Sequence, residues 1–105
     1  MIREFMMEEV REQFLETVRS YISYWNTLPN KTIQERLEGL AFSILVILDG
    51  DTSSLPNFIV APNPHPDDKK YFQNNKENWF PENCIPAINC NISGCLHEIF
   101  YKVKP

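Results

Sequence analysis

Residues 36–48, with the sequence RLEGLAFSILVIL, decide the fold expected for this chain. Thr32 stands three residues before Glu35, a spacing at which each side chain can bond the other's free backbone N–H group at a helix start. The segment ends at Asp49 and Gly50, where glycine can take the left-handed conformation that closes a helix. We therefore predict a helix over residues 33–48, with one face formed by Ile33, Leu37, Leu40, Ile44 and Ile47.

The second half of this helix is apolar on every side, because Ser43 is the one polar residue between positions 41 and 48. A helix of this kind is typical of a protein core. It is too short to span a membrane, which needs roughly 20 apolar residues, and it carries Arg36 and Glu38. We therefore expect residues 33–48 to be buried and covered by the other elements.

Length and composition predict one cytoplasmic globular domain spanning residues 1–105, large enough to fold without disulfides. Ten basic and fourteen acidic residues are scattered along the chain, so no basic stripe is available for direct nucleic-acid binding. The N-terminal sequence MIREFMMEEVREQF has charges where a secretory signal needs an apolar core. The protein is therefore expected to remain in the cytoplasm, where the three cysteines should stay as thiols.

Residues 3–27 are predicted to form a long first helix. Apolar side chains recur every seven residues at Met7, Phe14, Tyr21 and Leu28, and this seam would pack on the central helix as an antiparallel hairpin. A helix of this length exceeds what one short partner can cover, so part of it could also form a homodimer interface.

The second half of the chain indicates a small antiparallel β element. Residues 55–61 form an apolar run bracketed by Pro56 and Pro62, which suits an edge strand, and residues 84–92 read as a second, irregular strand interrupted by Pro86. A short helix over residues 69–74, capped by Asp67 or Asp68, and a last helix over residues 95–102 complete the expected fold. The predicted fold class is α+β.

The sharpest chemical motif is HPDD at residues 65–68. It is similar to the motif of zinc-dependent N-acetylglucosaminyl deacetylases, a resemblance that implies His65 and Asp68 as zinc ligands and Asp67 as a base. The chain is about half the length of those enzymes and lacks their downstream paired histidines. A proline-rigidified turn at a helix start is therefore the favoured interpretation, and the zinc hydrolase is kept only as a remote alternative.

Other metal or nucleophile sites have weak support. Cys84, Cys90, Cys95 and His97 lack the paired Cys-x-x-Cys spacing of structural zinc, so buried or half-buried free thiols are expected instead. The segment DGDTSS at residues 49–54 starts like a calcium loop but has serine at the sixth position and valine at the twelfth. We expect no cofactor and no enzymatic activity.

A polar and aromatic surface is the remaining candidate for recognition, although a solvated loop would explain the same residues. Prolines hold its backbone extended, and histidines and aromatic edges could bind a small polar ligand or a protein partner. The residues predicted to take part are His65, Asp67, Asp68, Tyr71, Trp79, His97 and Glu98.

Four segments together resemble a family of small uncharacterised proteins encoded in bacteriophages, prophages and neighbouring mobile elements. They are RLEGLAFSILVILDG, LPNFIVAPNPHPDDKKY, ENWFPE and ISGCLHEIFY, within residues 10–102. The position of Cys95 is usually glycine in that family. The resemblance implies a small non-enzymatic binding protein in the host cytoplasm that inhibits a host defence or regulatory protein. The alternative is a sponge that sequesters a nucleotide-like signalling ligand, with Trp79 or Tyr71 stacking on its base.

Overall fold

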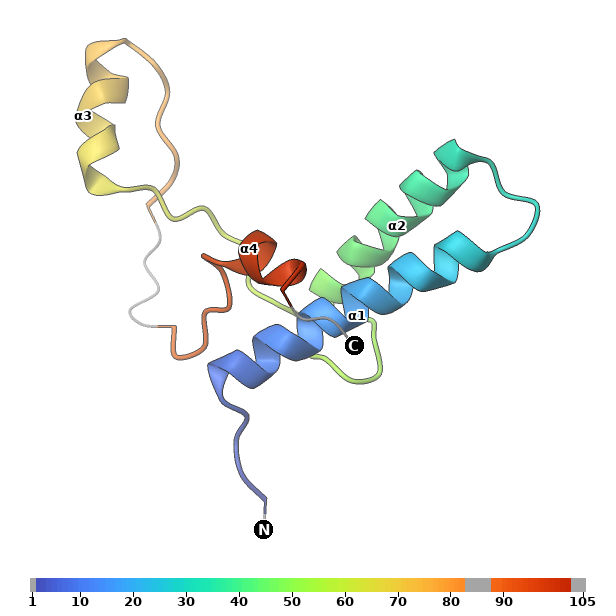
Figure 1. Cartoon of the computed structure of the whole chain (residues 1–105). Helices are drawn as coiled ribbons and strands as arrows, with labels where there is room; N and C mark the ends of the chain where they lie inside the picture. The colour runs from blue at the N-terminus through green and yellow to red at the C-terminus, as the bar shows by residue number, and fades with distance from the viewer. Residues whose placement is uncertain (1, 83–87, 103–105) are drawn as a thin grey trace. The chain divides into compact units, whose positions relative to one another are not determined.

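The computed structural model of the chain describes residues 2–82 and 88–102 (Figure 1). In this part of the chain the helices are α1 (Met7–Thr27), α2 (Ile33–Leu48), α3 (Pro66–Asn74) and α4 (Leu96–Phe100). The chain forms two compact units: unit 1 comprises Met1–Phe58 and Asn89–Pro105, and unit 2 comprises Ile59–Ile88. Helices α1, α2 and α4 belong to unit 1 and α3 to unit 2.

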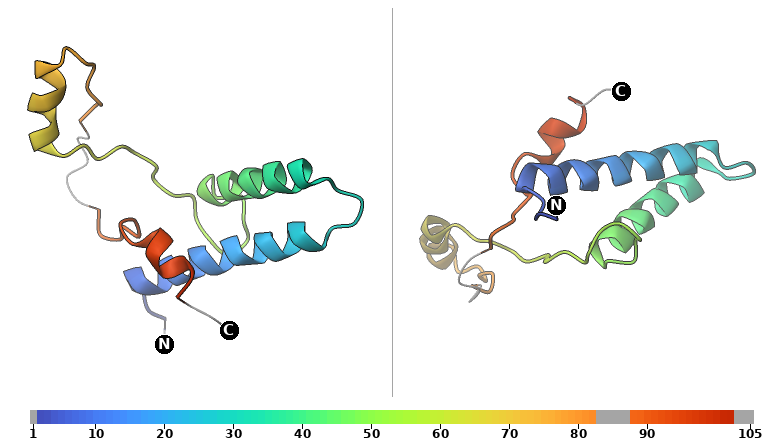
Figure 2. Two further views of the ribbon diagram at one scale, coloured as in Figure 1. Left: turned by 45° about the horizontal axis from the view of Figure 1, so that its top comes forward. Right: turned by 90° about the horizontal axis from the view of Figure 1, so that it is seen from below.

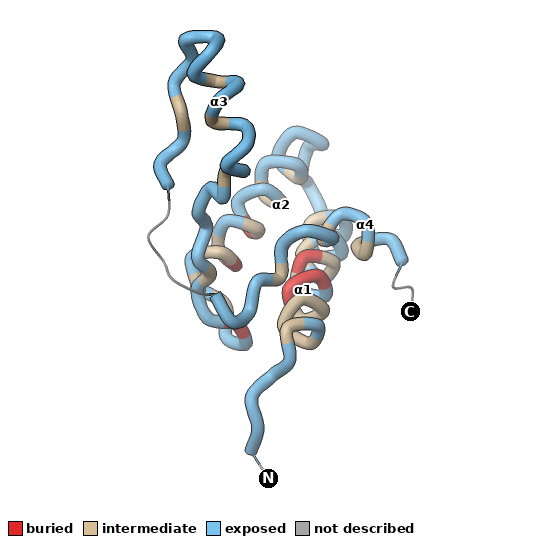
Figure 3. The backbone as a smooth tube through the Cα atoms, turned by 90° about the vertical axis from the view of Figure 1, so that its left-hand side faces the viewer, coloured by how far each residue is buried: buried red, intermediate tan, exposed pale blue. Residues whose placement is uncertain are grey.

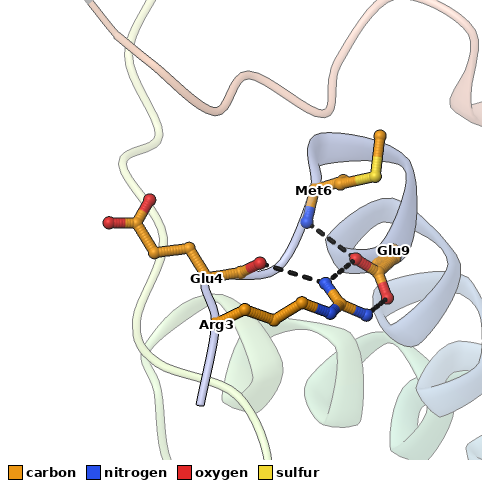
Figure 4. Close-up of polar contacts among 4 residues, drawn as sticks. All are labelled: Arg3, Glu4, Met6 and Glu9. Atoms are coloured by element: carbon orange, nitrogen blue, oxygen red, sulfur yellow. Dashed lines mark hydrogen bonds and ion pairs between the residues drawn. The ribbon is translucent and has the colours of Figure 1, made fainter. Parts of the chain in front are cut away.

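Helix α1 begins at Met7, four residues later than the predicted start at residue 3, and the side chain of Met6 before it makes no capping hydrogen bond. The Glu9 carboxylate makes the reciprocal bond of a capping box, accepting a hydrogen bond from the Met6 backbone N–H at 2.9 Å (Figure 4). Arg3 in turn donates two hydrogen bonds of 2.7 Å to the two Glu9 oxygens, and one of 3.1 Å to the Glu4 carbonyl. The side-chain bonds from Arg3 and then the Met6 backbone bond lower the pKa of Glu9 from 4.5 to about 2.

We expect this start of α1 to be sensitive to acid. Because the folded pKa of Glu9 lies below its ordinary value of 4.5, its stabilising contribution is complete above that pH and is lost as the pH falls through about 2. A carbon-13 NMR titration should place the Glu9 midpoint near 2 and move it upward in Arg3→Ala, but not in Arg11→Ala. A Glu9 midpoint that stays in place without Arg3 would show that the guanidinium is not responsible.

The predicted start and end of α2 are confirmed. Thr32 Oγ1 accepts from the Glu35 N–H at 3.1 Å, and Glu35 Oε1 accepts from the Thr32 N–H at 2.9 Å. The helix ends at Leu48, and Gly50 has a φ of 80°, in the left-handed region. These local signals therefore give α2 the bounds expected from its sequence.

Helices α1 and α2 form an antiparallel hairpin (Figures 1 and 2). The Trp25 indole N–H donates to Ser43 Oγ at 2.9 Å, and a Cβ atom at Gly39 would lie only 2.5 Å from the Trp25 ring. Arg36 Nη1 donates to the carbonyls of Trp25 and Asn26, both at 2.7 Å. Arg36 thus satisfies backbone acceptors at the C-terminal end of α1, where α1 has no basic side chain of its own.

The core of unit 1 is built mainly on α1. Figure 3 shows the buried stretch on this helix. Phe58 packs edge-to-face on Phe14 with ring centroids 5.5 Å apart, and Arg19 donates to the Phe100 carbonyl at 2.9 Å and so holds α4 against α1. The buried apolar side chains are Phe14, Leu15, Val18, Ile47 and Leu55.

The expectation that α2 is the buried centre of the molecule is wrong. Only Ser43 and Ile47 of this helix are buried. Ile33, Leu37, Phe42 and Leu45 keep 77%, 64%, 66% and 58% of their surface exposed. Among the described helices α1 alone packs along α2, and one neighbouring helix can cover only one side of a helix that is apolar nearly all round.

The predicted α+β class is also wrong, because residues 2–82 and 88–102 contain helices and irregular segments but no strand. Residues 55–61 are irregular, with no neighbouring strand. The Phe58 N–H donates to the Leu48 carbonyl at 2.9 Å, so it closes the end of α2 instead of joining a ladder. Of the second expected strand, residues 88–92 are irregular, whereas Cys84 and Pro86 lie outside the described residues.

Helix α3 starts at Pro66, earlier than predicted, and its cap is His65 and not Asp67 or Asp68. His65 Nδ1 accepts from the Asp67 N–H at 3.2 Å. Both aspartates instead occupy the first turn, where the helix dipole favours negative charge. Helix α4 covers five residues, fewer than the predicted range of 95–102.

None of the described helices has the length and apolar character needed to cross a membrane.

Candidate functional site

The structure separates the predicted site residues into two sets, which belong to different units. Helix α4 of unit 1 carries His97 and Glu98. The larger set belongs to unit 2 and comprises His65, Asp67, Asp68, Tyr71 and Trp79.

The start of α3 presents charged groups to solvent. The side chains of His65 and Asp67 are 67% and 90% exposed, and His65 Nδ1 lies 3.7 Å from Asp67 Oδ2. Because Nδ1 accepts the Asp67 N–H, that nitrogen is engaged in capping α3. This geometry agrees with the interpretation of HPDD as a rigid helix start.

Three aromatic side chains cluster within unit 2. Phe72 of α3 packs edge-to-face on Trp79 and Phe80, with ring centroids 5.2 and 6.3 Å apart, and Lys69 Nζ lies 2.9 Å from Glu82 Oε1. The Trp79 indole N–H is buried and has no acceptor among the described residues. Tyr71 is 64% exposed, so of the two aromatic residues suggested for stacking on a base, Tyr71 is the more accessible.

Helix α4 places the other two predicted residues at the surface of unit 1. The His97 and Glu98 side chains are 87% and 57% exposed, and His97 Nε2 lies 4.0 Å from Glu98 Oε1. His97 also lines a hollow of about 380 Å³. Its other walls are mostly apolar and come from Phe14, Leu15, Val18, Ile44, Leu96, Phe100 and Tyr101.

The cysteines do not follow the expectation of buried or half-buried thiols. Cys90 and Cys95 are free but exposed, and Cys84 lies outside the described residues. Within residues 2–82 and 88–102 no three His, Cys, Asp or Glu side chains come together in a group that could hold a metal ion. The described part of the chain therefore gives no ligand set for the zinc or calcium alternatives.

An exposed apolar surface on α2 was not predicted from the sequence. We call it the α2 face; it consists of Ile33, Leu37, Ala41, Phe42 and Leu45, all exposed. Four of them follow one another at four-residue intervals and so lie along one side of α2. A signal was present in RLEGLAFSILVIL, which is apolar on more sides than the predicted neighbours could cover.

The described residues define a small helical protein with an antiparallel helical hairpin and an exposed apolar helix face. Comparison of the chain with protein-family models, curated proteins and solved structures finds no match.

Proposed function

We propose that this protein acts by binding another protein, without catalysis, and that the α2 face is its binding surface. The observation that carries the proposal is the exposure of four large apolar side chains along one helix of four turns, Ile33, Leu37, Phe42 and Leu45. Monomeric soluble proteins rarely expose large groups of apolar side chains on one surface, and such surfaces mark interaction sites.

The free energy gained by covering the α2 face can be compared with the free-energy cost of association. Covering these four side chains, each more than half exposed, would contribute about 1–2 kcal/mol apiece. That total is comparable with the lower part of the cost of association, which is about 4–15 kcal/mol. Apolar contact alone would therefore give weak binding, and a tight complex needs complementary charge or further contacts.

The charges around the α2 face select a partner with basic flanks. Glu38 and Asp49 are exposed beside it, and the whole chain has a net charge of −4. Arg36 is directed to the carbonyls of Trp25 and Asn26, which leaves Lys31, just before the helix, as the nearby exposed cation. An amphipathic helix whose apolar stripe is bordered by lysine or arginine fits this surface and would be attracted to it over distance.

The resemblance to small phage-encoded proteins supports a host protein as the target, with a defence or regulatory protein of the host cytoplasm as the class. An acidic helical protein that covers a basic amphipathic segment could block that segment's own interactions.

A model peptide tests the surface directly. We expect a helical peptide of leucine and lysine, labelled for fluorescence anisotropy, to bind the wild type and to bind Leu37→Glu at least about tenfold more weakly, since a carboxylate would be placed in an apolar contact. Tyr71→Glu is the matched control, because Leu37 and Tyr71 are equally exposed at 64%. Equal losses from both variants, or none from Leu37→Glu, would remove the α2 face from the proposal.

The oligomeric state distinguishes a heterologous partner from a second copy. Sedimentation equilibrium of the wild type and of Leu37→Glu, under reducing conditions because Cys90 and Cys95 are exposed, should show monomers for both. A wild-type dimer that dissociates in Leu37→Glu would assign the α2 face to self-association. A dimer that persists in Leu37→Glu would favour the interface on the N-terminal helix.

A further inference from the structure

Unit 1 contains a cavity whose lining shares no residue with the α2 face. Its volume is about 530 Å³, within the size range of small-molecule sites. One wall is the side of α1 that carries Thr17, Ser20, Tyr21 and Tyr24, spaced three, one and three residues apart. The other wall is the segment 51–54, which follows α2.

Backbone hydrogen bonds and a close backbone contact hold segment 51–54 and the residues around it in place. The Asp51 N–H donates to the Val46 carbonyl at 3.1 Å, so the first residue of the segment is tied to α2. Four residues beyond the segment, the Phe58 N–H donates to the Leu48 carbonyl at 2.9 Å and returns the chain to the end of α2. At Gly50 a Cβ atom would lie 2.5 Å from the Asn57 backbone nitrogen. The cavity wall is thus held by bonds and close packing within unit 1.

The cavity is lined almost entirely by residues that carry a hydroxyl group. Seven of the eight lining residues carry a hydroxyl group, the eighth is Asp51, and none of these described residues is basic. Each hydroxyl can donate and accept a hydrogen bond, whereas the Asp51 carboxylate only accepts. This set matches a ligand that presents several hydroxyl groups, and the carboxylate disfavours a phosphate or another anion.

One hydroxyl in the lining lacks a partner. Thr52 Oγ1 is buried and has no hydrogen-bond partner among the described residues. By contrast, the Thr17 hydroxyl donates to the Gln13 carbonyl at 2.8 Å. Buried polar groups without partners are uncommon in proteins, and a rotation of the Thr52 side chain toward the cavity would let a ligand hydroxyl satisfy this one.

The two tyrosines add apolar surface to this polar lining. Tyr21 packs partly against the core cluster, and Tyr24 is 54% exposed and meets the Trp25 ring edge-to-face at 5.4 Å. A tyrosine ring can contact the C–H groups of a ligand, and the tyrosine hydroxyl can form a hydrogen bond with the ligand's polar groups. A sugar ring offers both kinds of group.

We propose that the cavity between α1 and segment 51–54 binds a neutral polyhydroxylated small molecule, either a free sugar or the sugar part of a nucleoside. The proposal is independent of the α2 face. It also differs from the nucleotide-like ligand suggested by the sequence, because the lining provides a carboxylate and no cation for a phosphate.

Saturation-transfer NMR with defined probes tests this site. The probes are neutral monosaccharides, neutral disaccharides and adenosine, each paired where possible with its phosphorylated form. We expect a neutral probe to bind at millimolar concentration or better and its phosphate to bind more weakly. Binding by no neutral probe, or stronger binding by the phosphates, would overturn the assignment.

A matched pair of threonine variants locates the binding. Thr52→Val keeps the shape of the side chain but removes the unpartnered hydroxyl, so we expect at least about tenfold weaker binding with an unchanged or higher melting temperature. Thr27→Val is the control, because the Thr27 hydroxyl bonds the carbonyls of Ser23 and Tyr24 and does not line the cavity. Equal affinity in the wild type and Thr52→Val would exclude the proposed hydrogen bond.

If Thr52→Val alters the fold, Asp51→Asn offers a second readout. Removing the negative charge should narrow the difference in affinity between a neutral probe and its phosphate. The same difference in the wild type and Asp51→Asn would show that Asp51 does not set the preference.

Discussion

Ile47→Ala is expected to lower the free energy of unfolding by about 2–5 kcal/mol, one of the largest effects available in this chain. Ile47 has no exposed surface and is the most completely buried large side chain among the described residues. It joins α2 to the core residues of α1, so its truncation would leave a cavity between the two helices of the hairpin. Urea denaturation followed by circular dichroism measures this change.

Leu45→Ala is the control for that substitution. It removes the same kind of side chain from the same helix only two positions away, but Leu45 is 58% exposed. Its loss should therefore cost less than about 1 kcal/mol, mainly from partial burial. Similar costs for the two variants would mean that both sides of α2 are covered in solution, contrary to the structure.

Gly50→Ala is expected to destabilise the protein by about 2–4 kcal/mol, for two separate reasons. Gly50 has a φ of 80°, which alanine adopts only with strain, and its added Cβ atom would lie 2.5 Å from the Asn57 backbone nitrogen. Backbone cannot move aside as a flexible side chain can. Urea denaturation gives the magnitude, and a change in the NMR signals of residues 51–54 would show that the cavity wall has shifted.

Gly94→Ala separates the two causes. Gly94 also has a positive φ, of 116°, but nothing lies within 4 Å of the position its Cβ would take. This variant should therefore show the backbone strain alone, about 1–2 kcal/mol. A cost at Gly94 as large as that at Gly50 would contradict the close contact between Gly50 and Asn57.

Local signals in the sequence predicted the helical hairpin well. The Thr32–Glu35 pair and Gly50 involve neighbouring residues, and their geometry depends little on the rest of the fold. The predicted apolar seam of α1 does face the core at two of its positions, since Phe14 is buried and Tyr21 packs against the core. The start of α3 was predicted less well, because His65 competes with two aspartates for the capping position.

The strand prediction failed for a reason that lies outside the segment itself. Residues 55–61 have a strand-like composition, but a strand needs a neighbour to accept its backbone hydrogen bonds. The carbonyl of Leu48 at the end of α2 accepts the Phe58 N–H instead. No count of apolar residues within the segment distinguishes these two outcomes.

The exposure of candidate site residues was predicted from the sequence, but the two proposed binding surfaces were not. The sequence indicated exposed polar residues such as His65 and Asp67, and both are exposed. It did not indicate the hydroxyl-lined cavity, whose two walls lie about thirty residues apart in the chain, at Tyr21 and at Thr52. The sequence of segment 49–54 indicated a turn and departed from a calcium loop, but it did not indicate a ligand site.

The sequence by itself determined where α2 begins and ends and where α1 ends, because caps, a left-handed glycine and helical periodicity act between residues one turn apart. Only the tertiary structure decided which apolar side chains are buried. That outcome depends on how many neighbours a helix obtains, and α2 obtains one along its length, so Ile47 is enclosed while Leu37 and Leu45 remain exposed. Burial is a property of the whole arrangement, whereas a helix end is a property of a few adjacent residues.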